Sequence, residues 1–184
     1  MNPWVVLDRD GVINRELDGC VRRVVDWSPL PGSLEAIGAL TQAGFRIAVA
    51  TNQAGLARGW LTVAELEGIH HKMCAEVERL GGKIEGIFYC PHDSHDGCDC
   101  RKPRTGLLDA IEAHLGADLR GAHMVGDSLK DIQAARAKGC QPVLVRTGKG
   151  TQTETTTLLW PHYGENTLIF ENLADFAQFL IKKA

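Results

Sequence analysis

The sequence predicts an α/β protein in which a mostly parallel central sheet is covered by helices on both faces. Short apolar segments alternate with longer amphipathic ones along most of the 184 residues, and strands that alternate with helices form parallel βαβ units. The short segments are nearly continuous apolar runs, which is typical of parallel strands buried on both faces. No linker or internal repeat divides the chain. We therefore expect a three-layer sandwich that forms a single domain over residues 1–184.

The individual elements follow from these patterns. Strands are expected at residues 4–7, 46–50, 84–89, 122–125, 142–145 and, as a short edge strand, 168–170. Apolar residues at helical spacing predict helices at 33–43, 62–80, 107–115, 129–138 and 173–181. The longest helix opens with a capping box, Thr62 to Glu65, and its apolar face should run from Val63 to Leu80. The polar, repetitive segment 151–157 predicts a loose loop. No insertion is long enough for a cap domain, so any site should be open.

Composition and charge limit the possible partners. A hydrophobic content of 44% and a charged content of 23% are typical of a soluble globular protein. A net charge of -3 gives no reason to expect nucleic acid or an anionic membrane as a partner. No apolar run could span a bilayer, and the N-terminus lacks the layout of a signal peptide. We expect a cytoplasmic monomer without nucleic-acid or membrane partners.

Two carboxylates, Asp8 and Asp10, follow the first strand directly and precede Gly11. Side chains two residues apart after a strand share one face, and ligands bind at the carboxyl ends of strands in open α/β sheets. Carboxylates held this close repel each other unless a cation lies between them or one is protonated. The pair therefore indicates a metal or catalytic site, and the alternative is an exposed Asp-Gly turn.

Three further strand ends carry polar residues. Thr51 and Asn52 follow the second strand, Arg101 and Lys102 come after the third, and Gly126-Asp127-Ser128 follows the fourth. Each alone has an ordinary explanation, a helix cap or a solvated surface pair. In a parallel sheet all four ends meet at one edge, so chance explains their common position poorly. We expect them to form one site.

The segment 90–100 contains four potential zinc ligands, which are Cys90, His92, Cys98 and Cys100. Cysteine and histidine side chains in a short loop suit tetrahedral Zn²⁺, and cysteines beside histidines favour metal over disulfides. Four protein ligands close the site, so the zinc should be structural and should position Arg101 and Lys102. His95 is the alternative to His92, and free thiols on a flexible loop are the alternative to a metal. Histidines outside this segment, His70 among them, carry no motif.

The four strand ends resemble the haloacid dehalogenase-type phosphohydrolases. The four motifs of that superfamily match Asp8-Arg9-Asp10-Gly11, Thr51, Lys102 and the run 126–131, and the resemblance covers residues 4–150. Val12 stands where the superfamily usually has threonine, which removes a possible hydroxyl contact. The resemblance implies that the sandwich is Rossmann-like and that the protein is a magnesium-dependent phosphatase.

The resemblance also implies a role for each matched side chain. Asp8 would be the nucleophile that forms an aspartyl-phosphate. Asp10 would protonate the leaving oxygen and then deprotonate the water that hydrolyses this intermediate. Thr51 and Lys102 would hold the phosphoryl oxygens as negative charge moves onto them.

A magnesium site is implied by the same resemblance. Mg²⁺ takes oxygen ligands in octahedral geometry, and these would come from Asp8, Asp127 and the backbone carbonyl of Asp10. Asp131 would either lie behind these ligands or be a carboxylate that the helix dipole favours in a first turn. The sequence leaves both readings of Asp131 open.

Two branches of the superfamily combine a compact core with a zinc loop. One acts on a heptose 1,7-bisphosphate in the synthesis of ADP-heptose for lipopolysaccharide, and the other acts on histidinol phosphate. The runs 7–14, 51–59 and 147–150 resemble the heptose branch. The short interval from His92 to Cys98 resembles the histidinol branch as much, and Ser128 stands where some heptose enzymes have lysine. The resemblance favours removal of the 7-phosphate from the heptose. A phosphate- or zinc-binding module without turnover is the non-enzymatic alternative.

Charge at the rim supports a phosphorylated sugar. A bisphosphate presents a second anionic group to the rim, whereas histidinol phosphate presents a cationic amine. Arginine side chains suit bidentate binding of a phosphate. Rim candidates are Arg22, Arg23, Arg58, Arg101 and Arg104, although Arg22, Arg23 and Arg104 are each better explained as surface charge. By resemblance the loop 16–19 would close over sugar hydroxyls. The expected substrate-binding residues are Glu16, Leu17, Asp18, Gly19, Asn52, Gln53, Ala54, Arg58, Arg101 and Ser128.

Overall fold

A computed structural model describes residues 2–159 and 165–184, and in these a six-stranded parallel sheet forms the centre of the molecule. Its strands are β1 (Trp4–Leu7), β2 (Arg46–Asn52), β3 (Ile84–Cys90), β4 (His123–Gly126), β5 (Gln141–Val145) and β6 (Leu168–Phe170). The strand order is β3-β2-β1-β4-β5-β6, which is a Rossmann-like order. The chain extends in opposite directions from β1, so the switch point lies between β1 and β4. Ligands bind beyond the carboxyl ends of the strands at such a point.

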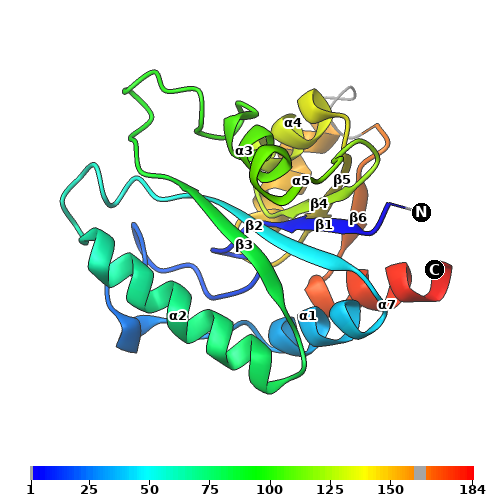
Figure 1. Cartoon of the computed structure of the whole chain (residues 1–184). Coiled ribbons are helices and arrows are strands. Elements are labelled where there is room, and N and C mark those ends of the chain that lie inside the picture. The colour runs from blue at the N-terminus through cyan, green and yellow to red at the C-terminus, as the bar shows by residue number, and fades with distance from the viewer. Residues whose placement is uncertain (1, 160–164) are drawn as a thin grey trace.

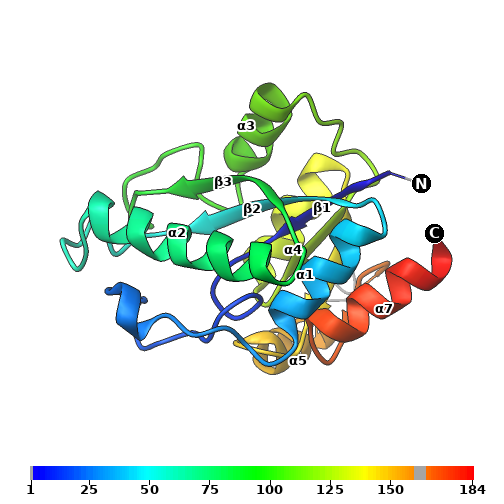
Figure 2. The ribbon, with the colours of Figure 1, turned by 60° about the horizontal axis from the view of Figure 1, so that its bottom comes forward.

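Helices cover both faces of this sheet (Figures 1 and 2). One face carries α1 (Ser33–Gln42), α2 (Val63–Arg79) and α7 (Leu173–Lys183), and the other carries α3 (Gly106–Leu115) and α4 (Leu129–Lys138). A short 3-10 helix, η1 (Val24–Asp26), lies in the loop before α1, and α5 (Gly150–Leu159) follows β5. In the described residues no element stands apart as a cap, and no helix is long and apolar enough to cross a membrane. The expected three-layer sandwich is confirmed.

Alternating side chains of the strands build the two cores. Val5 and Leu7 of β1 pack in the cluster that includes α1, α2 and α7, whereas Val6 packs in the cluster that includes α3 and α4. Successive side chains of a strand point to opposite faces, so a continuous apolar run supplies both cores at once. Burial of β1 on both faces fixes the position of Asp8, which comes directly after it.

The expected loop at 151–157 is wrong, because α5 covers these residues. Threonine has a low intrinsic helix propensity, but tertiary contacts override it here. Thr153 is buried and donates a hydrogen bond from its hydroxyl to the backbone carbonyl of Asp127 at 2.7 Å. Glu154 forms an ion pair with Arg146 at 2.7 Å. These partners lie outside the segment, so its local pattern could not reveal them.

The apolar face expected for α2 is correct in its middle and wrong at its ends. Leu66, Ile69, Met73 and Val77 are buried, but Val63 is 51% exposed and Leu80 is 42% exposed. Both lie at the ends of the helix, where the sheet no longer covers it. Helical spacing alone therefore overestimated the length of the buried stripe.

We expect Thr62→Ala to lower the free energy of unfolding by about 1 kcal/mol, measured by urea denaturation. The backbone N–H of Glu65 donates to the Thr62 hydroxyl at 3.2 Å, and the Glu65 carboxylate accepts from the Thr62 N–H at 2.6 Å. Alanine removes half of this capping box. Thr105→Ala is the matched control, because Thr105 precedes α3 without a side-chain capping bond. Equal losses in the two variants would contradict the assignment.

Candidate active site

A cavity of about 380 Å³ lies at the carboxyl ends of the central strands. It brings together side chains from all four strand ends that the sequence predicted to converge. These are Asp8, Asp10, Thr51, Asn52, Arg101, Lys102, Asp127 and Ser128. The switch point between β1 and β4 therefore carries the polar residues that the sequence expected there.

Lys102 connects three of the segments that form the cavity. Its Nζ lies 3.0 Å from Asp8 Oδ1 and 2.6 Å from Asp131 Oδ1, and it donates to the backbone carbonyl of Ala50 at 2.7 Å. One donor of the ammonium group is thus used by the Ala50 carbonyl, and both carboxylates lie within ion-pair distance of its charge. Burial alone would lower the pKa of Lys102, but Asp131 and Asp8 raise it above its ordinary value. Lys102 is therefore a fixed positive charge beside Asp8.

Asp131 serves two neighbours at once. Its Oδ1 pairs with Lys102, while its Oδ2 accepts hydrogen bonds from the backbone N–H and the hydroxyl of Ser128 at 3.1 and 2.5 Å. The carboxylate thus closes the first turn of α4 and also pairs with Lys102, so its position in a first turn is confirmed. A Cβ on Gly126 would lie 2.2 Å from the Asp131 Cβ, so only glycine permits this close packing.

Carboxylate oxygens of Asp8, Asp127 and Asp131 lie within 4.8 Å of one another. Burial raises the pKa of Asp8 to about 7, opposed by Lys102 and assisted by Asp131 and Asp10. Burial also raises the pKa of Asp127 to about 8, with further contributions from Asp8 and Asp131. A divalent cation between the carboxylates would relieve this repulsion.

The donor atoms of this group fit a hard divalent cation. Lys102 and the Arg9 backbone N–H both contact Oδ1 of Asp8, and the Lys149 backbone N–H donates to Oδ2 of Asp127 at 2.8 Å. Within the described part of the chain, this leaves Oδ2 of Asp8 and Oδ1 of Asp127 as available ligands. Mg²⁺ prefers such oxygens.

Two glycines allow loops to close around Asp127. A Cβ on Gly11 or Gly148 would lie 2.1 or 2.2 Å from Asp127 Oδ2, and both residues have positive φ. The Thr147 hydroxyl donates to the Gly11 carbonyl at 2.6 Å and ties the two loops together. The loop after β5 is thus part of the site, although the sequence offered it only as a resemblance.

Asp10 is held by three side chains. Arg9 Nη2 lies 3.0 Å from each of its oxygens, and Asn14 Nδ2 and Gln53 Nε2 donate to it at 2.9 and 3.1 Å. Desolvation alone would raise the pKa of Asp10, but Arg9 and the hydrogen bonds lower it below its ordinary value. Asp10 is therefore ionised here. The spacing of these residues points the Arg9 side chain away from the cavity. It gives no indication that the buried guanidinium contacts Asp10.

The predicted substrate-binding residues fall into two groups. Those that line the cavity are Glu16, Gly19, Asn52, Gln53, Ala54, Arg58, Arg101 and Ser128. Leu17 and Asp18 line a neighbouring hollow beside Trp60 instead. Two of the three doubtful arginines have other partners, because Arg23 pairs with Asp26 and Arg104 donates to backbone carbonyls of the zinc loop.

Two lysines line the cavity without having been predicted to bind substrate. Lys130 lies in the acidic motif after β4, and Lys149 lies in the loop after β5 and forms an ion pair with Glu16. Both positions were within motifs that the sequence singled out. From the sequence alone, neither lysine could be distinguished from an ordinary charged residue on the protein surface.

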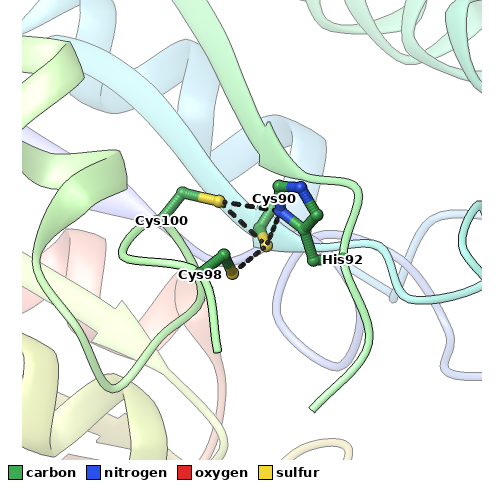
Figure 3. Close-up of side chains that lie close together, drawn as sticks. All are labelled: Cys90, His92, Cys98 and Cys100. Carbon is green, nitrogen blue, oxygen red and sulfur yellow. Dashed lines mark hydrogen bonds between the residues drawn. The ribbon is translucent and has the colours of Figure 1, made fainter. Parts of the chain in front are cut away.

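Figure 3 shows the side chains of the predicted zinc ligands converging on one point. Cys90 Sγ lies 3.6 Å from Cys98 Sγ and 3.2 Å from Cys100 Sγ, and His92 Nδ1 lies 3.3 Å from Cys100 Sγ. Three sulfurs and one imidazole nitrogen fit tetrahedral Zn²⁺. His95 lies outside this group.

The cysteine and histidine cluster is joined to the cavity. Arg101 Nη1 donates to the carbonyl of His92 at 3.1 Å. Asn52 accepts from the backbone N–H of Lys102 at 3.0 Å and donates to its carbonyl at 3.1 Å. The loop therefore holds Arg101 and Lys102 against the end of β2.

Comparison with known proteins identifies the family. The chain is 49% identical over 178 residues to D-glycero-beta-D-manno-heptose-1,7-bisphosphate 7-phosphatase of Pseudomonas aeruginosa, covering 97% of each chain. The protein of the same name from Escherichia coli is 35% identical over 190 residues, covering 98% of this chain and 95% of that one. The chain belongs to the D-glycero-beta-D-manno-heptose-1,7-bisphosphate 7-phosphatase family.

Solved structures agree with this family. The crystal structure of D,D-heptose 1,7-bisphosphate phosphatase from Bordetella bronchiseptica, complexed with magnesium and phosphate, matches with a TM-score of 0.93, 45% identity and complete coverage of both chains. The enzyme from Burkholderia thailandensis matches with a TM-score of 0.74, 37% identity and 97% coverage of each chain. A family model described as HAD-hydrolase-like matches residues 99–176, which contain Lys102 and Asp127.

We expect stabilisation by Mg²⁺ to increase with pH. The raised pKa values of Asp8 and Asp127, about 7 and 8, mean that the metal-free protein loses stability as the pH rises through them. A bound cation removes this loss of stability. At high pH no protons compete with the cation for the two carboxylates. The rise in Tm on adding Mg²⁺ should therefore be larger at about pH 9 than at about pH 6.

Asp127→Asn is the control for this measurement, because it removes one of the two carboxylates and should reduce both the shift and its pH dependence. Equal Mg²⁺-induced shifts at both pH values in the unaltered protein would contradict the cation site.

Proposed function

We propose that this protein is a phosphatase that removes the 7-phosphate of D-glycero-D-manno-heptose 1,7-bisphosphate, in the synthesis of ADP-heptose for lipopolysaccharide. The observation that carries the proposal is Asp8, held at the switch point by Lys102 and lying beside Asp10 and Asp127. A nucleophile, an acid–base group and a cation site thus share one cavity. The named relatives and the magnesium- and phosphate-bound neighbour support the same function.

Mg²⁺ would be held by Asp8, Asp127 and the backbone carbonyl of Asp10, which supply the oxygens that this ion takes. When bound, it would neutralise charge between the nucleophile and the phosphate. Zn²⁺ would be held by the cluster at 90–100 in a structural role.

Hydrolysis would proceed in two steps. Asp8 attacks phosphorus in line, and the bond between phosphorus and the sugar oxygen breaks as that oxygen takes a proton from Asp10. Water then attacks the phosphorus of the aspartyl-phosphate while Asp10 takes a proton from it, which releases inorganic phosphate and restores Asp8. Each cycle consumes one water and leaves both carboxyl groups as they began.

Asp10 must take up a proton before it can act as an acid. Its contacts with Arg9, Asn14 and Gln53 favour the ionised form in the free protein. A phosphate dianion that arrives beside Asp10 raises its pKa, because a like charge disfavours ionisation. After the first step the ionised form is the one that activates water.

Lys102 and Thr51 would stabilise charge on the phosphoryl oxygens. Lys102 is held by Asp8, Asp131 and the Ala50 carbonyl, so it would act through its charge and through its hold on Asp8. Thr51 is buried, and its hydroxyl accepts from Gln53 Nε2 at 2.8 Å. This leaves the hydroxyl proton of Thr51 free to be donated to a phosphoryl oxygen.

Charge around the cavity favours a bisphosphate over an amine. The cations Arg58, Arg101, Lys130 and Lys149 line it, and of these Arg58 already pairs with Asp93 and Lys149 with Glu16. Glu16, the acidic residue on the loop after β1 that also lines it, already forms an ion pair with Lys149. Histidinol phosphate would need a free anion for its amine, which makes it the weaker candidate.

We also propose that residues 1–184 form one phosphatase domain, and that the protein works as a cytoplasmic monomer without nucleic-acid or membrane partners. One continuous sheet and a net charge of -3 support this. A phosphate- or zinc-binding module without turnover is disfavoured, because it would have no need of an acid–base group held as Asp10 is.

The proposed activity is tested by phosphate release with Mg²⁺ present. Asp10→Asn should lower kcat by about 100-fold or more, because the amide cannot exchange the proton. The unaltered protein should show a higher kcat/KM on the heptose bisphosphate than on histidinol phosphate. The reverse preference would overturn the substrate. Equal inactivity of both proteins on all phosphomonoesters would overturn the enzyme.

The zinc assignment is tested by metal analysis of the purified protein. We expect one zinc per chain, and we expect Cys98→Ser to lose it together with much of the phosphatase activity, because Arg101 and Lys102 follow the cluster directly. Cys74→Ser is the control, since Cys74 lies on α2 outside the cluster. Unaltered protein without stoichiometric zinc would refute the assignment.

A further inference from the structure

A buried histidine of α2 lies beneath the cavity without any role in the proposed reaction. His70 is 8% exposed, and its Nε2 lies 3.1 Å from Nη1 of Arg9. Arg9 is fully buried and does not line the cavity. Its guanidinium therefore lies between the imidazole and Asp10. A cation buried this deeply needs a partner for its donors.

The contacts of Arg9 fix the state of the imidazole. Arg9 Nε and Nη2 contact Asp10, Nη2 also lies 3.3 Å from Gln53 Oε1, and Nη1 faces His70. A guanidinium can only donate, so Nε2 of His70 must accept. The ring is therefore neutral and carries its proton on Nδ1. Burial and the Arg9 charge lower the pKa of His70 to about 4, in agreement with this state.

We propose that His70 is a positioning residue, which accepts a hydrogen bond from Arg9 Nη1 and thereby fixes the guanidinium plane that orients both oxygens of Asp10. The role in catalysis rests on the proposed function. Without an acceptor, the buried Nη1 donor would be unsatisfied, and the guanidinium would turn toward another partner. Asp10 would then turn with it, away from the sugar oxygen and the water.

The proposal predicts a defect in kcat rather than in KM. Neither His70 nor Arg9 lines the cavity, so neither would touch the substrate. A small displacement of an acid–base group slows proton transfer while leaving binding unchanged. A histidine that merely filled the core would affect stability without this separation.

Three variants test the inference. His70→Phe keeps a ring but removes the acceptor, and it should lower kcat roughly tenfold at unchanged KM. His70→Gln restores an acceptor and should recover most of kcat. His71→Gln, on the exposed side of the same helix, is the control and should match the unaltered protein. A folded His70→Phe protein with unaltered kcat, or a His70→Gln protein as slow as His70→Phe, would overturn the proposal.

A nuclear magnetic resonance measurement on the unaltered protein tests the contact even if His70→Phe fails to fold. The ring ¹⁵N resonances of His70 should show a proton on Nδ1 and no titration between about pH 6 and pH 8. The charged and titratable groups around the ring are Arg9, Asp10, Tyr89 of β3, and Glu67, His71 and Cys74 of α2. A proton on Nε2, or titration in this range, would overturn the proposal.

The resonance measurement does not depend on catalytic activity. Failure of the proposed function can therefore be distinguished from failure of the inference about His70. If the unaltered protein releases no phosphate from the heptose bisphosphate, the proposed function fails and the catalytic role of His70 fails with it. If it is active and the His70 ring carries its proton on Nε2, only the inference about His70 fails.

Discussion

The ammonium group of Lys102 is the interaction on which the site depends. It lies between Asp8 and Asp131 and is 2% exposed. Breaking a buried ion pair leaves an uncompensated charge and is strongly destabilising. The end of β1, the segment after the zinc ligands and the start of α4 are therefore held in one arrangement. The candidate nucleophile takes its position from this contact rather than from its own strand alone.

Charge balance explains why a cation belongs in this cavity. Four aspartates, Asp8, Asp10, Asp127 and Asp131, line it, and two buried cations contact them: Lys102 pairs with Asp8 and Asp131, and Arg9 contacts Asp10 from outside the cavity. Lys102 pairs with Asp8, whereas no side-chain cation pairs with Asp127 in the described residues. The imbalance falls on Asp8 and Asp127, whose pKa values are raised, whereas Arg9 keeps that of Asp10 low. The same charges thus give Asp8 and Asp127 a different electrostatic environment from that of Asp10.

In the loop that carries Lys102, a cluster of cysteine and histidine side chains that could hold zinc takes the place of a hydrophobic core. The segment after β3 is polar and has no regular secondary structure before α3, so it buries too little apolar surface to order itself. Convergence of Cys90, His92, Cys98 and Cys100 supplies the missing constraint. Asn52 then ties Lys102 to β2. A chain without a cap domain can hold a buried lysine in this way.

The sequence by itself determined the strands, most helices, the residues at the strand ends and the four residues of the cysteine and histidine cluster. These follow from spacing within short segments, which the chain carries locally. Tertiary structure decided the inward turn of Arg9 onto Asp10, the role of His70 beneath it and the helix at 150–159. It also moved Leu17 and Asp18 away from the cavity. Each of these features depends on a contact between segments that are distant in the sequence. The strength of that contact depends on how deeply it is buried. No local pattern records such a contact.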